Sequence, residues 1–438
     1  MRGLKSYVSR ILLSLIMAWS IISCTPEGYD IEKAGKNIFI LYSIGYNNLT
    51  GYLSEDISEA ISNFRPTSPN DILITYSHMA KRRGDYTTPT NPILTQIGLN
   101  ENGRVKADTL MIYPDNTNSA SASTLHEVLD FIKGKYPEAH YGILFSSHST
   151  GWVPQDYCND PGEYDSAAEN NYEFEWMSMR RAGARPALTW GVEMPDGSPV
   201  VKSFGSQTIS SSSKAYEMDI TDMALAIPMK MDYIIFDSCL MGGIEVAYEF
   251  RKVCRYMIFS QTEILANGMD YSRITSHTFF RNEPAMKQIC QDYYNQYAKE
   301  KGMDKSATIS LIDCSKLEDL AHICRQIFES QREEIAANEG SNEIQKYFRS
   351  GEYSYYHKWF YDLESIVNHS DTPKSMLLTF YEALDKCVRY KAATEKFMSD
   401  IVINEHCGLS MYLPYAEYDY LNSFYRTLEW NKATNLVQ

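Results

Sequence analysis

The sequence predicts an α/β protein with a mostly parallel central sheet, helices on both faces of that sheet, and a largely helical C-terminal part. Short, almost continuous apolar runs, such as 37–44 (NIFILYSI), alternate with segments of helical spacing, such as 53–61. Parallel strands are buried on both faces and therefore read as continuous apolar runs, and helices usually connect them. From residue 315 onward helical spacing dominates. One large sheet domain followed by a helical region is the expected result.

The predicted strands and helices alternate along the chain, as such a sheet requires. Apolar runs predict strands at 37–44, 71–76, 109–113, 141–145, 231–236, 256–260 and 307–312. Apolar residues at helical spacing predict helices at 53–61, 124–132, 219–227, 242–252, 315–328, 374–386 and 390–399. A last strand-like run, 408–413, stops at Pro414. Strands that alternate with helices indicate a parallel sheet covered on both faces.

The first 23 residues have the pattern of a bacterial export signal. Basic residues precede an apolar stretch that is too short for a convincing spanning helix. The stretch ends in IISC, which resembles a lipobox, so we expect cleavage before Cys24 and lipidation of that cysteine. An ordinary signal peptide or a short anchor helix is the alternative. The expected location is the bacterial cell envelope, periplasmic or cell-surface, with a lipid as the only membrane anchor.

The mature chain divides into three further stretches. A short polar tether, 24–35, precedes an α/β domain at 36–314. Within that domain, residues 153–215 are rich in Pro, Gly, Asp, Ser and charged residues, which predicts a long insertion loop. The mainly helical region with its final strand occupies 315–438.

Charge and cysteine usage narrow the classes of function. The formal net charge is −15, and removal of the basic leader makes it three units more negative. Such a surface repels nucleic acid and anionic membranes, so no nucleic-acid partner is expected, whereas basic substrates or divalent cations are tolerated. The eight cysteines after Cys24 show no CxxC pair and no zinc spacing. Most are expected to be buried small apolar residues, although pairing in an oxidising compartment stays open.

Two polar residues stand just beyond predicted strands. His148 follows the run YGILF in the block SSHSTGW, and Cys239 follows YIIF in the block DSCLMG. Ligands of open α/β sheets bind beyond the carboxyl ends of the strands, so these two residues are the first candidates for a site. A thiol becomes a nucleophile as its thiolate, which a nearby imidazole or a helix N-terminus favours. The predicted helix 242–252 begins shortly after Cys239.

Each residue also has a simpler interpretation. A cysteine that ends a buried strand usually serves packing, and a histidine in a glycine-containing loop is usually a solvated turn residue. Together, at two strand ends, the pair favours a site, and spacing alone leaves the choice near even.

Six segments resemble, in the same order, the clostripain family of cysteine peptidases. They are IFILYSIGYNNLTGYLSEDI, HYGILFSSHSTGW, MDYIIFDSCLMGGIEVAYE, TEILANGMDY, ATISLIDCSKLEDL and GLSMYLP, and they span nearly the whole mature chain. The DSCLMG block resembles the family's nucleophile motif, and the block around His148 is similar to its His-Gly-x-Gly-Trp motif. The resemblance implies a caspase-like α/β fold and hydrolysis of peptide bonds in protein or peptide substrates.

By position, the resemblance implies that His148 is the catalytic histidine and Cys239 the nucleophile. The backbone N–H groups of Ser149 and Cys239 would then form the oxyanion site. At position 149 this chain has a serine where the family has a glycine. Serine keeps the backbone N–H donor but restricts the backbone conformation. No redox or organic cofactor is required, no metal ligands are assigned, and calcium stays possible from the resemblance and the acidic balance.

The resemblance also implies cleavage after Arg or Lys, with acidic groups in the pocket that receives this side chain. The candidates are Asp237, Glu263 and Asp270, and an N-cap role for Asp237 is equally expected. The family's continuation after Glu263 is replaced here by ANGMDY at 266–271.

A further implication is self-processing at a basic residue between the histidine and the nucleophile. The predicted insertion supplies basic candidates, which are Arg180, Arg181, Arg185, Lys202 and Lys214. Two alternatives stay open: an inactive surface binding protein on the same fold, suggested by Ser149 and the altered segment, and a different hydrolase or acyltransferase that uses the same Cys/His dyad.

Overall fold

The structure is a computed structural model that describes residues 35–83, 86–159, 161–165, 207–208, 215–349, 359–399 and 401–438. The leader, Cys24 and the basic residues proposed for processing at positions 180–202 and 214 lie outside these residues. No helix of the described part is long and apolar enough to cross a membrane.

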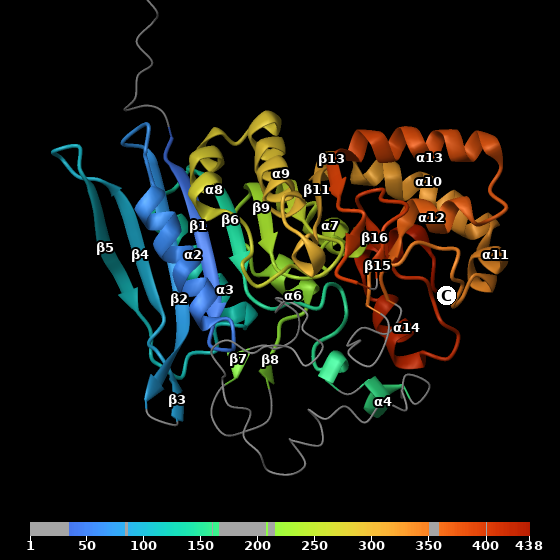
Figure 1. Ribbon diagram of the computed structural model, residues 1–438, viewed down its shortest axis with the longest axis horizontal. Helices are drawn as coiled ribbons and strands as arrows, with labels where there is room; N and C mark the ends of the chain where they lie inside the picture. The colour runs from blue at the N-terminus through green and yellow to red at the C-terminus, as the bar shows by residue number, and fades with distance from the viewer. Residues whose placement is uncertain are drawn as a thin grey trace, which may run out of the picture.

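A ten-stranded sheet forms the centre of the molecule (Figure 1), in the order β13-β11-β10-β9-β6-β1-β2-β4-β5, with β3 paired to β2. Its strands are β1 (Asn37–Gly45), β2 (Asp71–Arg83), β3 (Tyr86–Pro89), β4 (Ile93–Leu99), β5 (Val105–Ile112), β6 (His140–Ser146), β9 (Met231–Asp237), β10 (Cys254–Phe259), β11 (Thr308–Asp313) and β13 (Val388–Ala393). The five neighbours from β10 to β2 run parallel, whereas the pairings at both flanks are antiparallel.

The parallel core aligns its strand ends at one edge. Eight of the nine residues of β1 are buried, as expected for a strand covered on both faces. In the register of the sheet, Ser43 of β1 lies beside Ser146 of β6, which in turn lies beside Asp237 of β9. The loops that leave these strands therefore start next to one another.

Helices cover both faces of the sheet (Figure 1). On one face α2 (Thr50–Asn63) packs on α8 (Tyr271–His277), and α8 packs on α9 (Glu283–Ala298). On the other face α6 (Ile220–Leu225) contacts both α3 (Ala122–Lys135) and α7 (Ile244–Phe250). The apolar stripe of α3, with Leu125, Val128, Leu129 and Ile132 buried, is the helical spacing seen in the sequence.

The C-terminal region is mainly helical, and it also completes the sheet. Its helices are α10 (Leu317–Ser330), α11 (Arg332–Ala337), α12 (Leu363–Asn368), α13 (Lys374–Cys387), α14 (Asp419–Tyr425) and α15 (Glu429–Thr434). Strand β13 pairs with β11 at the edge of the main sheet. Short two-stranded ladders join β12 (Tyr361–Asp362) to β16 (Ser410–Met411) and β14 (Lys396–Phe397) to β15 (Ile401–Val402).

The predicted fold class is confirmed, with two local corrections. The helix predicted at 390–399 is wrong, because residues 388–393 form β13 and residues 396–397 form β14. Pairing with β11 overrides the weak helical spacing of this segment. The predicted final strand at 408–413 is reduced to the two residues of β16.

Part of the predicted insertion loop is folded onto the C-terminal region. The Asp165 carboxylate accepts hydrogen bonds from the backbone N–H groups of Tyr420 and Leu421, at 2.7 and 3.1 Å, at the start of α14. It also accepts one from the Tyr157 hydroxyl at 2.8 Å. Later in the insertion, β7 (Gln207–Thr208) pairs with β8 (Ala215–Tyr216).

The eight cysteines of the described chain are all buried, and none of them forms a disulfide. This agrees with the expectation that most serve as small apolar residues.

Candidate active site

The loops after β6 and β9 carry His148 and Cys239, and the structure brings the two loops together. The Ser149 hydroxyl donates a hydrogen bond to the Cys239 carbonyl. Gly151 adopts a positive φ of 65°, and a Cβ atom there would lie only 2.6 Å from the Leu240 carbonyl oxygen. The close approach of the two loops therefore depends on a glycine at position 151.

Cys239 is fully buried beneath the segment that follows β10. Its Sγ atom accepts a hydrogen bond from the Ile264 N–H at 2.9 Å and lies 3.6 Å from the Ile264 carbonyl oxygen. The Leu240 N–H donates to the Thr262 carbonyl at 3.0 Å, and the Gly242 N–H donates to the Ser260 carbonyl at 2.7 Å. The nucleophile loop is thus hydrogen-bonded to the segment that follows β10.

Helix α7 begins only at Ile244, with Gly243 as its N-cap. The hydrogen bond from the Ile264 N–H to the sulfur comes from outside this helix. The expected effect of the helix N-terminus on the thiolate stays a prediction. Because Gly243 is the N-cap, the alternative role of Asp237 as N-cap of this helix is wrong.

His148 is half-buried beside a cavity of about 110 Å³. Its Nε2 atom lies 2.6 Å from the Asn48 side-chain oxygen. Ser147, Ser149 and Ser238 contribute polar groups to the cavity, and its apolar lining includes Phe145, Phe236, Ile220 and Met223. The cavity therefore offers a mostly apolar space directly beside the candidate imidazole.

Asp237 lies on the face of the sheet covered by α8 and α9 and is fully buried. Its Oδ2 atom accepts hydrogen bonds from the Tyr271 hydroxyl at 2.7 Å and from the Ser146 hydroxyl at 3.5 Å. The pKa of Tyr271 is raised well above its usual value, first by burial and then by the charges of Asp237 and Asp56. The pKa of Tyr297 is also raised well above its usual value, mainly by burial and then by the charges of the same two carboxylates. Two buried acidic groups thus lie close to the nucleophile loop.

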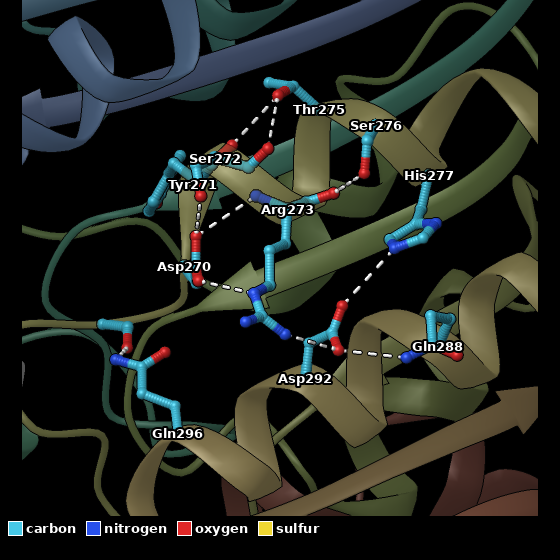
Figure 2. Close-up of polar contacts among 11 residues, drawn as sticks. Asp270, Tyr271, Ser272, Arg273, Thr275, Ser276, His277, Gln288, Asp292 and Gln296 are labelled. Carbon is cyan, nitrogen blue, oxygen red and sulfur yellow. Dashed lines mark hydrogen bonds and ion pairs between the residues drawn. The ribbon is translucent and has the colours of Figure 1, made fainter. Parts of the chain in front are cut away.

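Asp270 is occupied by contacts within its own helix (Figure 2). It is the N-cap of α8, where Oδ1 accepts from the Arg273 N–H at 3.1 Å and Oδ2 pairs with Arg273 Nε at 3.1 Å. Figure 2 shows that the same guanidinium reaches Asp292 of α9, at 3.2 Å. Asp292 in turn pairs with His277 at 3.4 Å. These contacts tie the start of α8 to α9.

Glu263 is buried in the segment that covers Cys239, directly before Ile264. A little further along, the Gly268 carbonyl accepts hydrogen bonds from the side chains of Tyr297, at 2.6 Å, and Gln296, at 3.3 Å. The segment over the thiol is therefore anchored to α9.

Sequence reasoning did not single out four residues of this region, which are Asn48, Asp56, Ile264 and Tyr271. Asn48 follows β1, so the rule about strand ends, applied to the first strand as well, would have selected it. Nothing in the sequence marks the other three, because their roles depend on contacts between distant elements.

The described residues contain no group of three or more His, Cys, Asp or Glu arranged to hold a metal ion.

The mixed sheet, its helical layers and the C-terminal region together form a caspase-like α/β fold. A family model described as the clostripain family matches residues 41–172 and 194–436. The inactive zymogen of a C11 protease from Parabacteroides distasonis is similar, with 27% identity and a TM-score of 0.68 over 92% of this chain and 98% of that chain. A secreted C11 cysteine protease from Bacteroides thetaiotaomicron, in complex with an irreversible peptide inhibitor, shares 22% identity and the fold, with a TM-score of 0.67 over 92% and 99% of the two chains. The search of curated proteins gave no match.

The chain therefore belongs to the clostripain family and is a cysteine-type endopeptidase.

Proposed function

We propose that Cys239 and His148 form the catalytic dyad of this endopeptidase. The observation that carries the proposal is the direct contact between their loops, made by the Ser149 hydroxyl on the Cys239 carbonyl and by Gly151 against Leu240. Both loops leave adjacent parallel strands at the edge where open α/β sheets bind ligands.

In the proposed reaction the Cys239 sulfur attacks the scissile carbonyl carbon, forming a C–S bond, while the thiol proton passes to His148 and the carbonyl oxygen takes up the negative charge. The backbone N–H groups of Ser149 and Cys239 stabilise the negative oxygen of the tetrahedral intermediate. His148 transfers a proton to the leaving amine as the C–N bond breaks. Water then hydrolyses the acyl-enzyme, which releases the carboxylate product and restores the thiol.

The described arrangement is a closed form of this site. The thiol is fully buried and its sulfur is bonded to the Ile264 N–H, so the segment that follows β10 must shift before a substrate carbonyl can reach the sulfur. The similar structure of the C11 protease from Parabacteroides distasonis is that of an inactive zymogen. Consistent with this, we propose that cleavage within residues 153–215 activates the chain by releasing the covering segment.

Cys239→Ala and His148→Ala test the dyad. Each variant is expected to lose peptide hydrolysis, and Cys239→Ala should also lose labelling by a thiol-reactive peptidyl probe. Cys324→Ala is the matched control, because this cysteine is equally buried in α10 but lies in another part of the fold. Activity that survives in Cys239→Ala would rule out the proposed nucleophile. Hydrolysis without Cys239-dependent labelling would point to another mechanism, and labelling without hydrolysis to a binding protein.

We further propose cleavage after Arg or Lys, with Asp237 as the acidic group that receives the basic side chain. Its support is the buried carboxylate beside the nucleophile loop, with Asp56 as a second acid in the same neighbourhood. Asp237→Asn keeps the shape and an acceptor for Tyr271 but removes the charge. It should lower kcat/KM for Arg and Lys peptides by about a hundredfold, since loss of one partner of a buried ion pair costs roughly 3 kcal/mol. Profiling of a peptide library by mass spectrometry measures this, and an unchanged preference would contradict the role of Asp237.

The geometry gives less support to the other two acidic candidates for substrate binding, Asp270 and Glu263. Asp270 is paired with Arg273, and Glu263 is buried in the covering segment, so both would have to change partners when the segment shifts.

We propose that lipidation at Cys24 anchors the mature chain to the cell envelope. Its support is the lipobox-like ending of the leader, and related proteases are described as secreted. Detergent-phase partitioning of wild type and Cys24→Ala tests the anchor, since a variant that stays in the membrane fraction would contradict it. Self-processing is tested by incubation of wild type beside Cys239→Ala, because identical fragment patterns would exclude it.

A further inference from the structure

Asn48 lies in the short loop between β1 and α2, beside the loop that carries His148. Strand β1 ends at Gly45 and pairs in parallel with β6, so the loops after these two strands lie next to each other. The Asn48 Oδ1 atom is 2.6 Å from His148 Nε2. A second hydrogen bond ties the His148 loop to the end of β1, from the Ser147 hydroxyl to the Ile44 carbonyl at 2.8 Å.

The neighbours of Asn48 fix the position of its loop. Asn47 is buried, its side-chain oxygen accepts from the Leu49 N–H at 2.9 Å, and its amide donates to the Ile44 carbonyl at 3.3 Å. Leu49 is fully buried and packs with Leu53. Asn48 itself is exposed, so its side chain buries little surface. Its side-chain oxygen contacts the imidazole of His148.

The chemistry of the amide determines the protonation of the ring. An amide oxygen only accepts hydrogen bonds, so Nε2 is the donor in this contact. The proton of neutral His148 then lies on Nε2, and Nδ1 is the ring nitrogen that can take up a second proton. When the ring takes up a second proton, the same oxygen accepts a charge-assisted hydrogen bond, which is stronger than a neutral one.

We propose that Asn48 is a positioning residue for His148. It selects the tautomer in which Nδ1 accepts and returns the proton during peptide hydrolysis, it holds the plane of the ring, and it stabilises the ring in its protonated form. The proposal rests on the proposed dyad, because it gives Asn48 a role only if His148 moves a proton in the reaction.

A purely structural tie between the two loops predicts different behaviour. Loss of such a tie would lower the melting temperature and the activity together, and the charge of a replacement side chain would not matter. A positioning role instead predicts a change in kcat and in the pH profile with the fold unaltered.

The test uses the full secreted chain, with fluorogenic peptide amides that end in Arg, Lys or an uncharged residue. Asn48→Ala should lower kcat by about ten- to a hundredfold, with KM and Tm nearly unchanged. Asn48→Asp keeps an acceptor and adds a negative charge that favours the protonated ring. It should restore most of the activity and move the His-dependent limb of the pH profile to higher pH.

Asn63→Ala is the matched control, because Asn63 is also exposed and its amide donates within α2, to the Glu59 carbonyl at 2.9 Å. It should leave kcat and the pH profile unchanged. Cys239→Ala and His148→Ala are measured in parallel. If both are inactive while Asn48→Ala keeps the wild-type kcat and pH profile, the role of Asn48 is overturned and the dyad stands.

If either Cys239→Ala or His148→Ala stays active, the dyad is overturned and the role of Asn48 falls with it. A joint fall of Tm and kcat in Asn48→Ala that Asn48→Asp does not rescue would also overturn the proposal, since that is the behaviour of a structural tie.

Discussion

The loop after β6 and the loop after β9 leave adjacent parallel strands in register, yet they place their candidate catalytic groups in opposite environments. His148 is half-buried, lines a cavity and is held by the side chain of Asn48. Cys239 is fully buried, and its sulfur is held by the backbone of Ile264. Topology therefore brings two residues to one edge, whereas the burial of each residue depends on which neighbouring segment lies against it.

The difference gives the two halves of the site different roles in the activation proposed above. The imidazole of His148 already lines a cavity. The cysteine side is covered, so the activation proposed above would have to act on the segment after β10 and on its contact with α9. Two substitutions at the junction of the two loops, and one in the helix that follows the Cys239 loop, would break or sharpen this comparison.

Gly151→Ala should have the largest effect, because it forces the two loops apart. A Cβ atom would lie 2.6 Å from the Leu240 carbonyl and 2.8 Å from the Phe360 ring, at a residue with positive φ. We expect a loss of roughly 2–4 kcal/mol in the free energy of unfolding, together with loss of peptidase activity. Chemical denaturation measures the first quantity.

Gly134→Ala in α3 is the control for Gly151→Ala, since a Cβ atom at position 134 would meet no neighbouring side chain or loop within 4 Å. It should raise stability by about 0.5–1 kcal/mol, as alanine favours a helix. Equal stability changes in the two variants would show that the loops do not depend on Gly151.

Glu245 should give an intermediate effect that depends on pH. It lies in α7, shortly after the Cys239 loop, and its Oε1 accepts from the Tyr412 N–H and the Tyr425 hydroxyl, each at 2.8 Å. Burial raises the pKa of Glu245 to about 7. Because the folded pKa exceeds the unfolded one, the folded state binds more protons between these values, and the contribution of this group to stability falls as pH rises from about 4.5 to 7.

The full change across this window is roughly 3 kcal/mol, from the size of the shift. Glu245→Gln keeps the Oε1 acceptor and removes the titration, so its stability should depend less on pH in this window. Denaturation of both proteins at pH 5 and pH 7.5 measures the difference. Parallel curves for the two proteins would contradict the assignment to Glu245.

Ser149→Ala should have the smallest effect on stability. It removes the hydroxyl that donates to the Cys239 carbonyl, which is worth about 1 kcal/mol. Activity should fall moderately, because the backbone N–H of residue 149 remains. Ser123→Ala, an exposed serine at the start of α3, is the control. A Ser149→Ala protein as stable as wild type would mean that Gly151 alone keeps the loops together.

Several features of the fold were predictable because they depend on local pattern. The apolar runs of β1, β6 and β9 and the helical spacing of α3 and α10 were recognised, since burial on one or two faces leaves its period in the sequence. The strand β4 was missed and β13 was predicted as a helix. Both pair antiparallel at the flanks of the sheet, where partly exposed strands carry a weaker apolar signal.

The candidate site divides in the same way. His148 and Cys239 were predictable as polar residues at the ends of buried strands, and the motifs around them resemble those of the clostripain family. The contact of Asn48 with the imidazole, the cover over the thiol and the Tyr271 hydroxyl on Asp237 were not, because each joins segments that are distant in sequence.

By itself the sequence determined the fold class, the family and the strand ends at which the candidate dyad lies. Periodic burial and short motifs depend on residues that are close together in the sequence, so both can be recognised without the structure. Only the tertiary structure decided that the imidazole meets an asparagine and that the thiol lies covered. Those outcomes depend on the register of β1, β6, β9 and β10 and on the helices that anchor the loops, and packing between distant elements sets both.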